Sequence, residues 1–360
     1  MSVRFSDEER EKGSMNTMYT PIMYQKKLKY PISGHPNNVE IDVVRDFEKI
    51  CGRILQKLDI KRKNINDSSM DYYRLMHRLI ENKPRKIMKA ISFSCPVEYE
   101  RALKLIERII QCGENLHPFM TRNLKRLQYE DLLLSDWGIY HLHLSEEIDP
   151  RDGFMQRSDK LLMVRIEDKT VYFIAVVDHN LKNVWSLKRY IEIIKANWPE
   201  TIERYRMNEM HLLEKLSDDD YAMCRKAHAT TLIELDDGSC YGLIGGGYMS
   251  DGTSAQALRE HDYNERVLAD MEEILIHSLP EYLKKYGILC DNGKCLEVEM
   301  IGFDAGNYWY VEKNYHLFIQ MRFDGKFFHT KVMSAEVMYN LCRNERGLHA
   351  KEHIGNWKRL

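Results

Sequence analysis

The sequence predicts an α+β fold, and three observations support that prediction. Apolar residues recur with a helical period before residue 136, alternate with polar residues just after it, and form further alternating segments in the last third. The chain has 360 residues, of which 44% are hydrophobic and 30% charged, as in a globular protein of two or three domains. We therefore predict a helical N-terminal region, a central small antiparallel sheet with flanking helices, and a second α+β domain at the C-terminus.

The first third of the chain divides into an irregular arm and a helical region. Residues 1–38 show no sustained period and contain three prolines, so we predict the arm there. Residues 39–135 form the helical region. One of its helices follows Pro96 and ends at Gly113, because proline suits a first turn and glycine a helix C-terminus. The predicted helices cover about 39–58, 69–82, 97–112 and 119–130.

Strand patterns begin at Asp136, which opens a predicted sheet domain over residues 136–215. In "GIYHLHL" the two histidines share one face, and the alternate residues Tyr140, Leu142 and Leu144 are expected to face the core. The segment "KLLMVRIEDKTVYFIAVVDH" then predicts two strands joined by a tight turn. The second of these strands is apolar throughout, so we predict that it is central, and a helix should follow over about 185–197.

Charge is distributed unevenly along the chain. Residues 1–135 contain 25 Lys and Arg against 18 Asp and Glu, a balance of +7, whereas residues 216–360 contain 16 against 23, a balance of −7. The basic third is expected to meet an anionic partner such as RNA. Its densest stretch, "NKPRKIMK", supplies the candidate RNA-binding residues Lys83, Arg85, Lys86 and Lys89.

The last third, residues 216–360, is predicted to be the second α+β domain. A hairpin pattern turning at Asp237-Gly238 is followed by a glycine-rich loop, a long helix over about 254–286 and two further hairpins. Backbone amides near Gly246, Gly247 and Ser250 are candidates to bind a phosphate at the helix N-terminus, although such residues also serve simply as loop and cap residues. We expect this acidic third to regulate or recruit, so that a chain ending near residue 216 keeps any nuclease activity.

The central segment resembles the RelE/ParE-type toxins. The likeness rests on Gly138 and the alternating strand after it, on the hairpin that ends at His179, and on the helix near Trp185; it covers about residues 136–198. The resemblance implies a metal-independent RNA-cleaving domain of that fold group inside a larger protein, with a role as a toxin or in antiviral defence. The sequence departs from the family where Asn180 follows His179, since arginine is frequent there.

The candidate catalytic residues are His141, His143, His179 and Arg165. Metal-free RNA cleavage needs a base for the 2′-hydroxyl and an acid for the departing 5′-oxygen, and imidazole, with a pKa near ~6.5, can serve as either. A cation such as Arg165 would stabilise charge on the phosphate. We therefore predict an endoribonuclease, a hydrolase that uses no metal and no cofactor.

Two other interpretations use the same residues. Three imidazoles can form a metal site, and "HLHLSEE" with "HNLKN" is similar to cupin motifs, so a histidine-coordinated metalloenzyme is one alternative. A non-catalytic module that binds RNA or protein is the other. The expected partners are RNA and an antitoxin or regulatory protein. We expect a cytoplasmic protein without a membrane span, since no apolar run reaches 18 residues and the eight cysteines form no CxxC pair.

Overall fold

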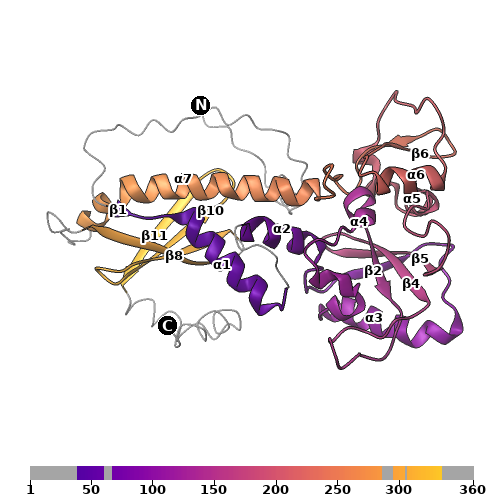
Figure 1. The fold of residues 1–360 in the computed structure, drawn as a ribbon, viewed down its shortest axis with the longest axis horizontal. Helices are drawn as coiled ribbons and strands as arrows, with labels where there is room; N and C mark the ends of the chain where they lie inside the picture. Colours follow the sequence, from indigo (N-terminus) through magenta and orange to yellow (C-terminus); the bar gives the residue numbers. More distant parts are fainter. Residues whose placement is uncertain (1–38, 61–66, 286–294, 305, 335–360) are drawn as a thin grey trace. The chain divides into compact units, whose positions relative to one another are not determined.

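The computed structural model describes residues 39–60, 67–285, 295–304 and 306–334, which form helices and mixed sheets (Figure 1). The predicted α+β class is confirmed. The predicted arm over residues 1–38 lies outside the described residues.

The chain forms two compact units that do not follow the predicted domain boundaries. Among the described residues, unit 1 comprises 73–259, and unit 2 comprises the segments before residue 73 and after residue 259. Both borders fall inside helices, α2 (Ser68–Arg78) and α7 (Ala255–Lys285). Much of the predicted helical region and the first part of the predicted C-terminal domain therefore belong to the same unit as the central sheet.

The sheet of unit 1 has four strands in the order β2-β5-β4-β3. The predicted hairpin is present, with β4 and β5 in the middle of the sheet and β3 antiparallel to β4 at one edge. Strand β2 lies in the region predicted to be helical and pairs parallel with β5. A four-residue strand is too short to show an alternating pattern, and β2 therefore could not be predicted from periodicity. The strands are β2 (Lys86–Lys89), β3 (Ile139–His143), β4 (Lys160–Ile166) and β5 (Thr170–Asp178).

Helices border both sides of this sheet, with α3 on one side and α5 and α6 on the other (Figure 1). Helix α3 ends as predicted at Gly113, whose left-handed φ of 71° suits glycine. The helix predicted over 119–130 is absent, because this segment forms two short 3₁₀ turns with an extended residue, Met120, between them. The helices of unit 1 are α3 (Glu100–Cys112), α4 (Leu132–Trp137), α5 (Arg189–Asn197) and α6 (Asp218–Lys226).

The core of unit 1 includes residues well beyond the central segment. Tyr221 and Tyr241 are 1% and 0% exposed and belong to the same apolar cluster as Ile174 of the central strand β5. Tyr221 lies on α6, and Tyr241 lies on β7 (Cys240–Tyr241), which pairs with β6 (Ile233–Glu234) as the predicted hairpin. A chain ending near residue 216 would lack these side chains. We therefore revise the expectation for that truncation: it should fail to fold rather than keep activity.

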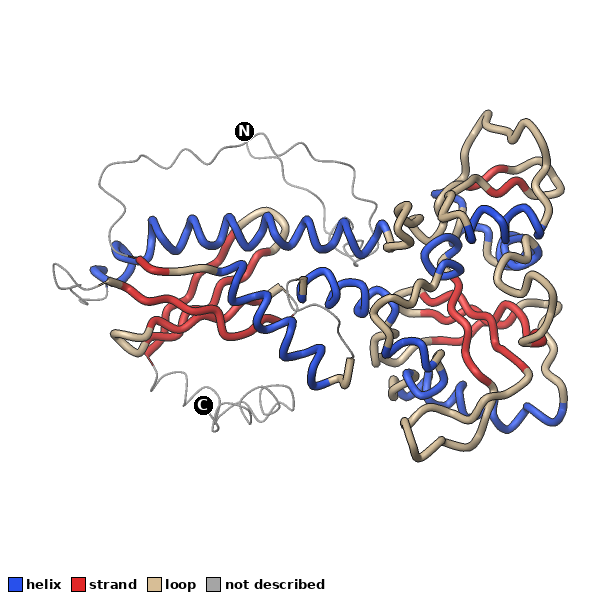
Figure 2. Tube along the Cα trace, viewed as in Figure 1, coloured by secondary structure: helices blue, strands red, loops and turns tan. Residues whose placement is uncertain are grey.

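Unit 2 contains a five-stranded sheet in the order β1-β8-β9-β10-β11 together with α1 and most of α7 (Figure 2). The apolar stripe predicted for α1 is buried at Val43, Phe47 and Ile50, and Asp42 caps the helix N-terminus. Tyr308 of β9 donates a hydrogen bond to Asn264 of α7 at 2.6 Å. The elements are β1 (Val39–Glu40), α1 (Val43–Lys57), β8 (Leu296–Asp304), β9 (Asn307–Glu312), β10 (Leu317–Phe323) and β11 (Phe328–Ser334).

No helix in the described part of the chain combines the length and apolarity needed to cross a membrane.

Candidate functional site

Three histidines predicted from the sequence lie together in unit 1, and we call them the histidine face. The ring centroids of His141 and His143 are 6.2 Å apart, and those of His143 and His179 are 6.1 Å apart. The indole of Trp185 contacts His141 at 4.8 Å and His179 at 5.9 Å between centroids. Trp185 was not among the predicted site residues, because its sequence position indicated only the start of a helix.

Strand pairing explains why the three rings meet. His141 and His143 are two residues apart on β3, so they project from the same face, opposite Met163 and Leu161 of β4. His179 directly follows β5, the neighbour of β4 on its other side. Its backbone N–H donates to the carbonyl oxygen of Asp159 at 2.7 Å, which holds the end of β5 beside the start of β4.

The other face of β3 is also covered, as predicted. Leu142 and Leu144 are 0% and 1% exposed, and the hydroxyl of Tyr140 reaches the carbonyl oxygen of His77 at 3.4 Å. The histidine face is itself largely enclosed, because His141 is only 5% exposed. The exposed part of the site is His179, which lies beyond the strand end.

Burial keeps the two strand histidines neutral. Desolvation lowers the pKa of His141, although the nearby Asp131 opposes the shift. The pKa of His143 falls to about 4, mainly because of burial and then through His141, His179, Arg157 and Arg122. Both imidazoles are therefore uncharged at neutral pH, the form in which a histidine accepts a proton.

Both strand histidines also have a buried ring nitrogen without a hydrogen bond. Among the described residues, neither His141 Nδ1 nor His143 Nδ1 has a hydrogen-bond partner. The carboxylate of Asp131 is 3.9 Å from His141 Nδ1, which is longer than a hydrogen bond. Unsatisfied buried polar atoms are rare in folded proteins and carry a free-energy cost, so two in one cluster favour a functional role for it.

The cations near these rings are not the one that the sequence predicted. Arg165 is buried and donates to the carbonyl oxygen of Thr201 at 3.1 Å, opposite Ile139 rather than opposite a histidine. Arg157 lies close enough for its charge to lower the pKa of His143. It is exposed and forms no ion pair within the described ranges, so its charge is open to an anion. Arg157 was not among the predicted site residues, because it lies in a polar loop before β4 that shows no motif.

A buried ion pair is connected to the histidine face through Trp185. The guanidinium of Arg225 in α6 contacts Asp136 at 2.9 Å and lies 3.9 Å from the ring centre of Trp137. Arg225 also donates to the carbonyl oxygen of Trp185, the residue whose indole contacts His141. Burial raises the pKa of Asp136, and Arg225 opposes that shift. The sequence held no signal for this pair, whose members are 89 residues apart.

The predicted RNA-binding cluster is largely paired with carboxylates. Lys83 forms ion pairs with Asp168 and Glu81, and Lys89 pairs with Glu107 at 2.8 Å. Arg85 is 8% exposed and donates to backbone carbonyl oxygens, including that of Glu81 at 2.8 Å. Of the four predicted cations, Lys86 alone has neither an ion pair nor a side-chain hydrogen bond among the described residues. Its strand position leaves it exposed.

The glycine-rich loop uses its amides within the chain. The N–H groups of Gly246 and Gly247 donate to the carbonyl oxygens of Leu243 at 2.8 Å and Ser135 at 2.7 Å. The carbonyl oxygen of Ser250 contacts His228 Nδ1 at 3.0 Å. These two amides are therefore not directed at a phosphate, and the loop packs against the segment that carries α4. These residues fit the alternative given from the sequence, in which they serve simply as loop and cap residues.

The histidine face does not converge on a metal position. Among the described residues, one set of three or more His, Cys, Asp and Glu side chains places a ligand atom from each within 4.8 Å of the others, and it lies on α7 of unit 2. It consists of His261, Asp262 and Glu265. In unit 1 the imidazoles stack or meet edge to face instead, which suits successive contacts with a substrate.

Comparison of the chain with protein-family models, with curated proteins and with solved structures gives no match.

Proposed function

We propose that unit 1 is a metal-independent endoribonuclease whose active site is the histidine face. The observation that carries the proposal is the meeting of three imidazoles, two with a buried nitrogen lacking a hydrogen bond, beside a cation that has no ion pair among the described residues. A role as a toxin or in phage defence is part of the proposal, and only the likeness to RelE/ParE-type toxins supports it.

The proposed reaction is attack of an RNA 2′-hydroxyl on the adjacent phosphate. His143 is neutral and partly exposed, so it takes the proton from the 2′-hydroxyl. His179 is exposed beyond the end of β5 and protonates the departing 5′-oxygen. Arg157 stabilises the negative charge that develops on the phosphate. This division of roles replaces the prediction that Arg165 serves the phosphate.

His141 and Trp185 are positioning residues in this scheme. His141 is too deeply buried to take a proton from a substrate directly, but its ring lies between Trp185 and His143. Asp131 lies on the Nδ1 side of His141 and favours the tautomer with a proton on that nitrogen. Fixing these rings lowers the entropy cost of placing His143 and His179 on one phosphate.

The test is incubation of the tag-free full chain with total RNA in the presence of EDTA. We expect His143→Ala and His179→Ala each to lower the cleavage rate by ~10²–10⁴. His211→Ala is the matched control, because His211 is an exposed imidazole of the same unit. Circular dichroism and melting temperature verify that each variant is folded.

Three results would refute the ribonuclease proposal. They are normal cleavage by folded His143→Ala, loss of cleavage on chelation, and RNA binding without any cleavage by the wild type. The last result would instead support the non-catalytic binding module.

A further inference from the structure

His228 joins three segments of unit 1 that are far apart in the sequence. It follows the C-terminus of α6, where its φ of 52° is in the left-handed region. Its Nε2 is 2.7 Å from Glu130 Oε2, which precedes α4, and its Nδ1 is 3.0 Å from the carbonyl oxygen of Ser250 in the glycine-rich loop (residues 245–253). We call His228, Glu130 and Ser250 the His228 clamp.

Both contacts of the clamp require the imidazole to donate. A backbone carbonyl and an ionised carboxylate accept hydrogen bonds and have no hydrogen to give. A neutral imidazole has one N–H group, so it can satisfy only one of these two acceptors, whereas an imidazolium satisfies both. The geometry of the clamp is therefore that of protonated His228.

The charged groups around the ring favour that proton. The hydrogen bond to Glu130 is the main cause that raises the pKa of His228, and the clamp's carbonyl oxygen and the charge of Asp251 raise it further, while desolvation opposes the shift. Arg74 lies 3.7 Å from Asp251 and offsets part of that negative charge. The ring of Tyr248 meets the imidazole edge to face at 6.4 Å between centroids.

The loop held by the clamp lines a cavity of about 150 Å³. Asp251 and Gly252 line it from the loop, and Glu130 and Asp131 line it from the segment before α4. Gly252 has a φ of 80°, and a Cβ at this position would overlap the Glu130 carboxylate, so the loop backbone packs directly on the clamp. Asp131 is also the carboxylate that lies 3.9 Å from His141 Nδ1. The clamp thus holds one wall of a cavity that extends to a neighbour of the histidine face.

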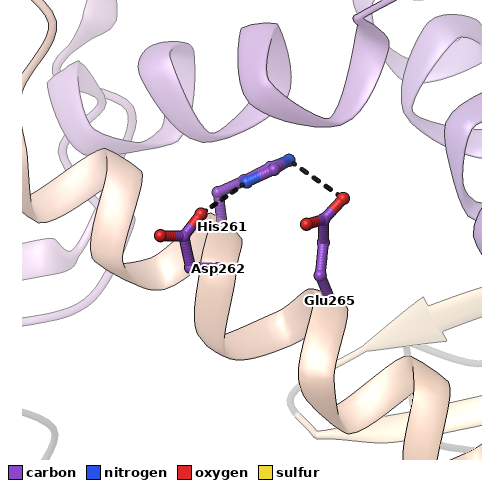
Figure 3. A group of neighbouring side chains, drawn as sticks. All are labelled: His261, Asp262 and Glu265. Atoms are coloured by element: carbon purple, nitrogen blue, oxygen red, sulfur yellow. Dashed lines mark hydrogen bonds and ion pairs between the residues drawn. The ribbon is translucent and has the colours of Figure 1, made fainter.

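A second histidine among carboxylates lacks this arrangement. His261 of unit 2 faces Asp262 and Glu265, and we call these three residues the His261 cluster (Figure 3). Both carboxylates belong to the helix that carries the imidazole, so the helix backbone keeps them near the ring at any pH. The two acceptors of the His228 clamp come from other segments of the chain, and their attachment depends on the bonds themselves.

We propose that the His228 clamp is a pH-sensitive latch on the glycine-rich loop, closed while His228 is protonated and open once it is neutral. Because the pKa of His228 is raised in the clamp, the latch is complete below a pH of ~6.5 and is lost as the pH rises through the raised value. Opening exposes the cavity beside Asp131 to solvent. The latch needs no RNA, so it is independent of the ribonuclease proposal.

The test is hydrogen exchange of the full chain, without RNA, at about pH 6 and about pH 8.5. At the lower pH, peptides of the glycine-rich loop should exchange on the order of tenfold faster in His228→Asn than in the wild type, because a charged hydrogen bond is lost. At the higher pH the two chains should exchange at nearly equal rates. Asparagine tolerates the left-handed backbone of this position, and comparison at one pH cancels the intrinsic pH dependence of exchange.

Two further variants locate the effect. His211→Gln is the matched control, because His211 is another exposed imidazole of unit 1 near a carboxylate, Glu234 at 4.0 Å, and it should leave loop exchange unchanged at both pH values. Glu130→Gln keeps the size of the side chain but removes its charge. It should lower the pH midpoint of loop protection and the midpoint of the His228 titration followed by NMR.

Three results would overturn the latch. The first is faster loop exchange in His228→Asn by the same factor at both pH values, which is the behaviour of a merely structural residue. The second is a wild-type His228 titration midpoint at or below ~6.5, a measurement that does not depend on how well a variant folds. The third is an unchanged midpoint in folded Glu130→Gln. Failure of the wild type to cleave RNA would leave all of these results unaffected.

Discussion

The histidine face of unit 1 and the His261 cluster of unit 2 place the same side chain in opposite electrostatic settings. Burial lowers the pKa of His143, and the charges of the neighbouring imidazoles and of Arg157 and Arg122 lower it further. His261 instead has carboxylates on both ring nitrogens. A ring among cations stays neutral and can serve an anionic substrate, whereas a ring among carboxylates can complete a cation site.

The difference shows why histidine spacing is a poor guide to chemistry. The HxH pair on β3 has the spacing of a metal motif, yet its nitrogens do not converge on a metal position. His261 stands alone in the sequence among acidic residues, and the converging set is found there. The groups that face an imidazole decide its role, and many of those groups come from elsewhere in the chain.

The largest expected effect separates the two histidines. His143→Asn should lower RNA cleavage by ~10²–10⁴ because it removes the proposed base. His261→Asn should leave cleavage unchanged, because His261 lies in unit 2 and the histidine face in unit 1. Cleavage rates of both folded variants measure this. Loss of cleavage in folded His261→Asn would contradict the placement of the active site in unit 1.

The next largest effect is expected for the buried ion pair of Arg225 and Asp136. Replacing Arg225 with Met leaves Asp136 buried without its partner, and we expect a loss of ~3–5 kcal/mol in the free energy of unfolding. Urea unfolding measures the loss.

A double variant tests whether the effect belongs to the pair. Arg225→Met combined with Asp136→Leu should be less destabilising than the sum of the two single changes, since no charge is then left unpaired. Strict additivity would mean that the two side chains act independently and would contradict this account.

Acid should weaken unit 1 through His143. Its pKa is about 4 in the folded chain and ~6.5 when unfolded, so the unfolded chain binds more protons between these values. The free energy of unfolding therefore falls as pH drops from about 6.5 towards 4. Between pH 7 and pH 4.5 the wild type should lose about 2 kcal/mol more than His143→Gln does.

Denaturant unfolding at the two pH values checks this difference. His77 has a similarly low pKa and also destabilises the fold in acid, but it is present in both proteins and cancels in the comparison. Equal losses in the wild type and in His143→Gln would contradict the burial argument.

The parts of the fold that depend on local pattern were predictable. The apolar stripe of α1, the cap at Gly113, and the alternation on β3 each follow from a period or a turn residue within a short window. The predicted meeting of His141, His143 and His179 was correct because strand pairing fixes it.

The parts that failed depend on partners far along the chain. Strand β2 exists because β5 provides its hydrogen bonds, and its four residues show no period. The role of Arg225 depends on Asp136, 89 residues away. Similarly, Lys83 forms an ion pair with Asp168, so the basic stretch in the sequence presents less unpaired positive charge than its composition indicates.

The smallest expected effect concerns which cations hold RNA. Arg157 has no ion pair among the described residues and is close to His143, whereas Lys83 and Lys89 already pair with carboxylates. A protein cation that neutralises an RNA phosphate releases counterions from the RNA, and each such contact contributes ~0.7–1 to the slope of log affinity against log salt concentration. A lysine whose charge is already neutralised within the protein contributes less.

We therefore expect Arg157→Gln to lower the slope by about 1 and the affinity a few-fold. The double variant Lys83→Gln, Lys89→Gln should change the slope by less than that. Single-stranded RNA binding to the His143→Ala form at several salt concentrations measures both without cleavage. A larger slope change in the lysine variant would return the binding surface to the predicted basic cluster, where Lys86 is the exposed member.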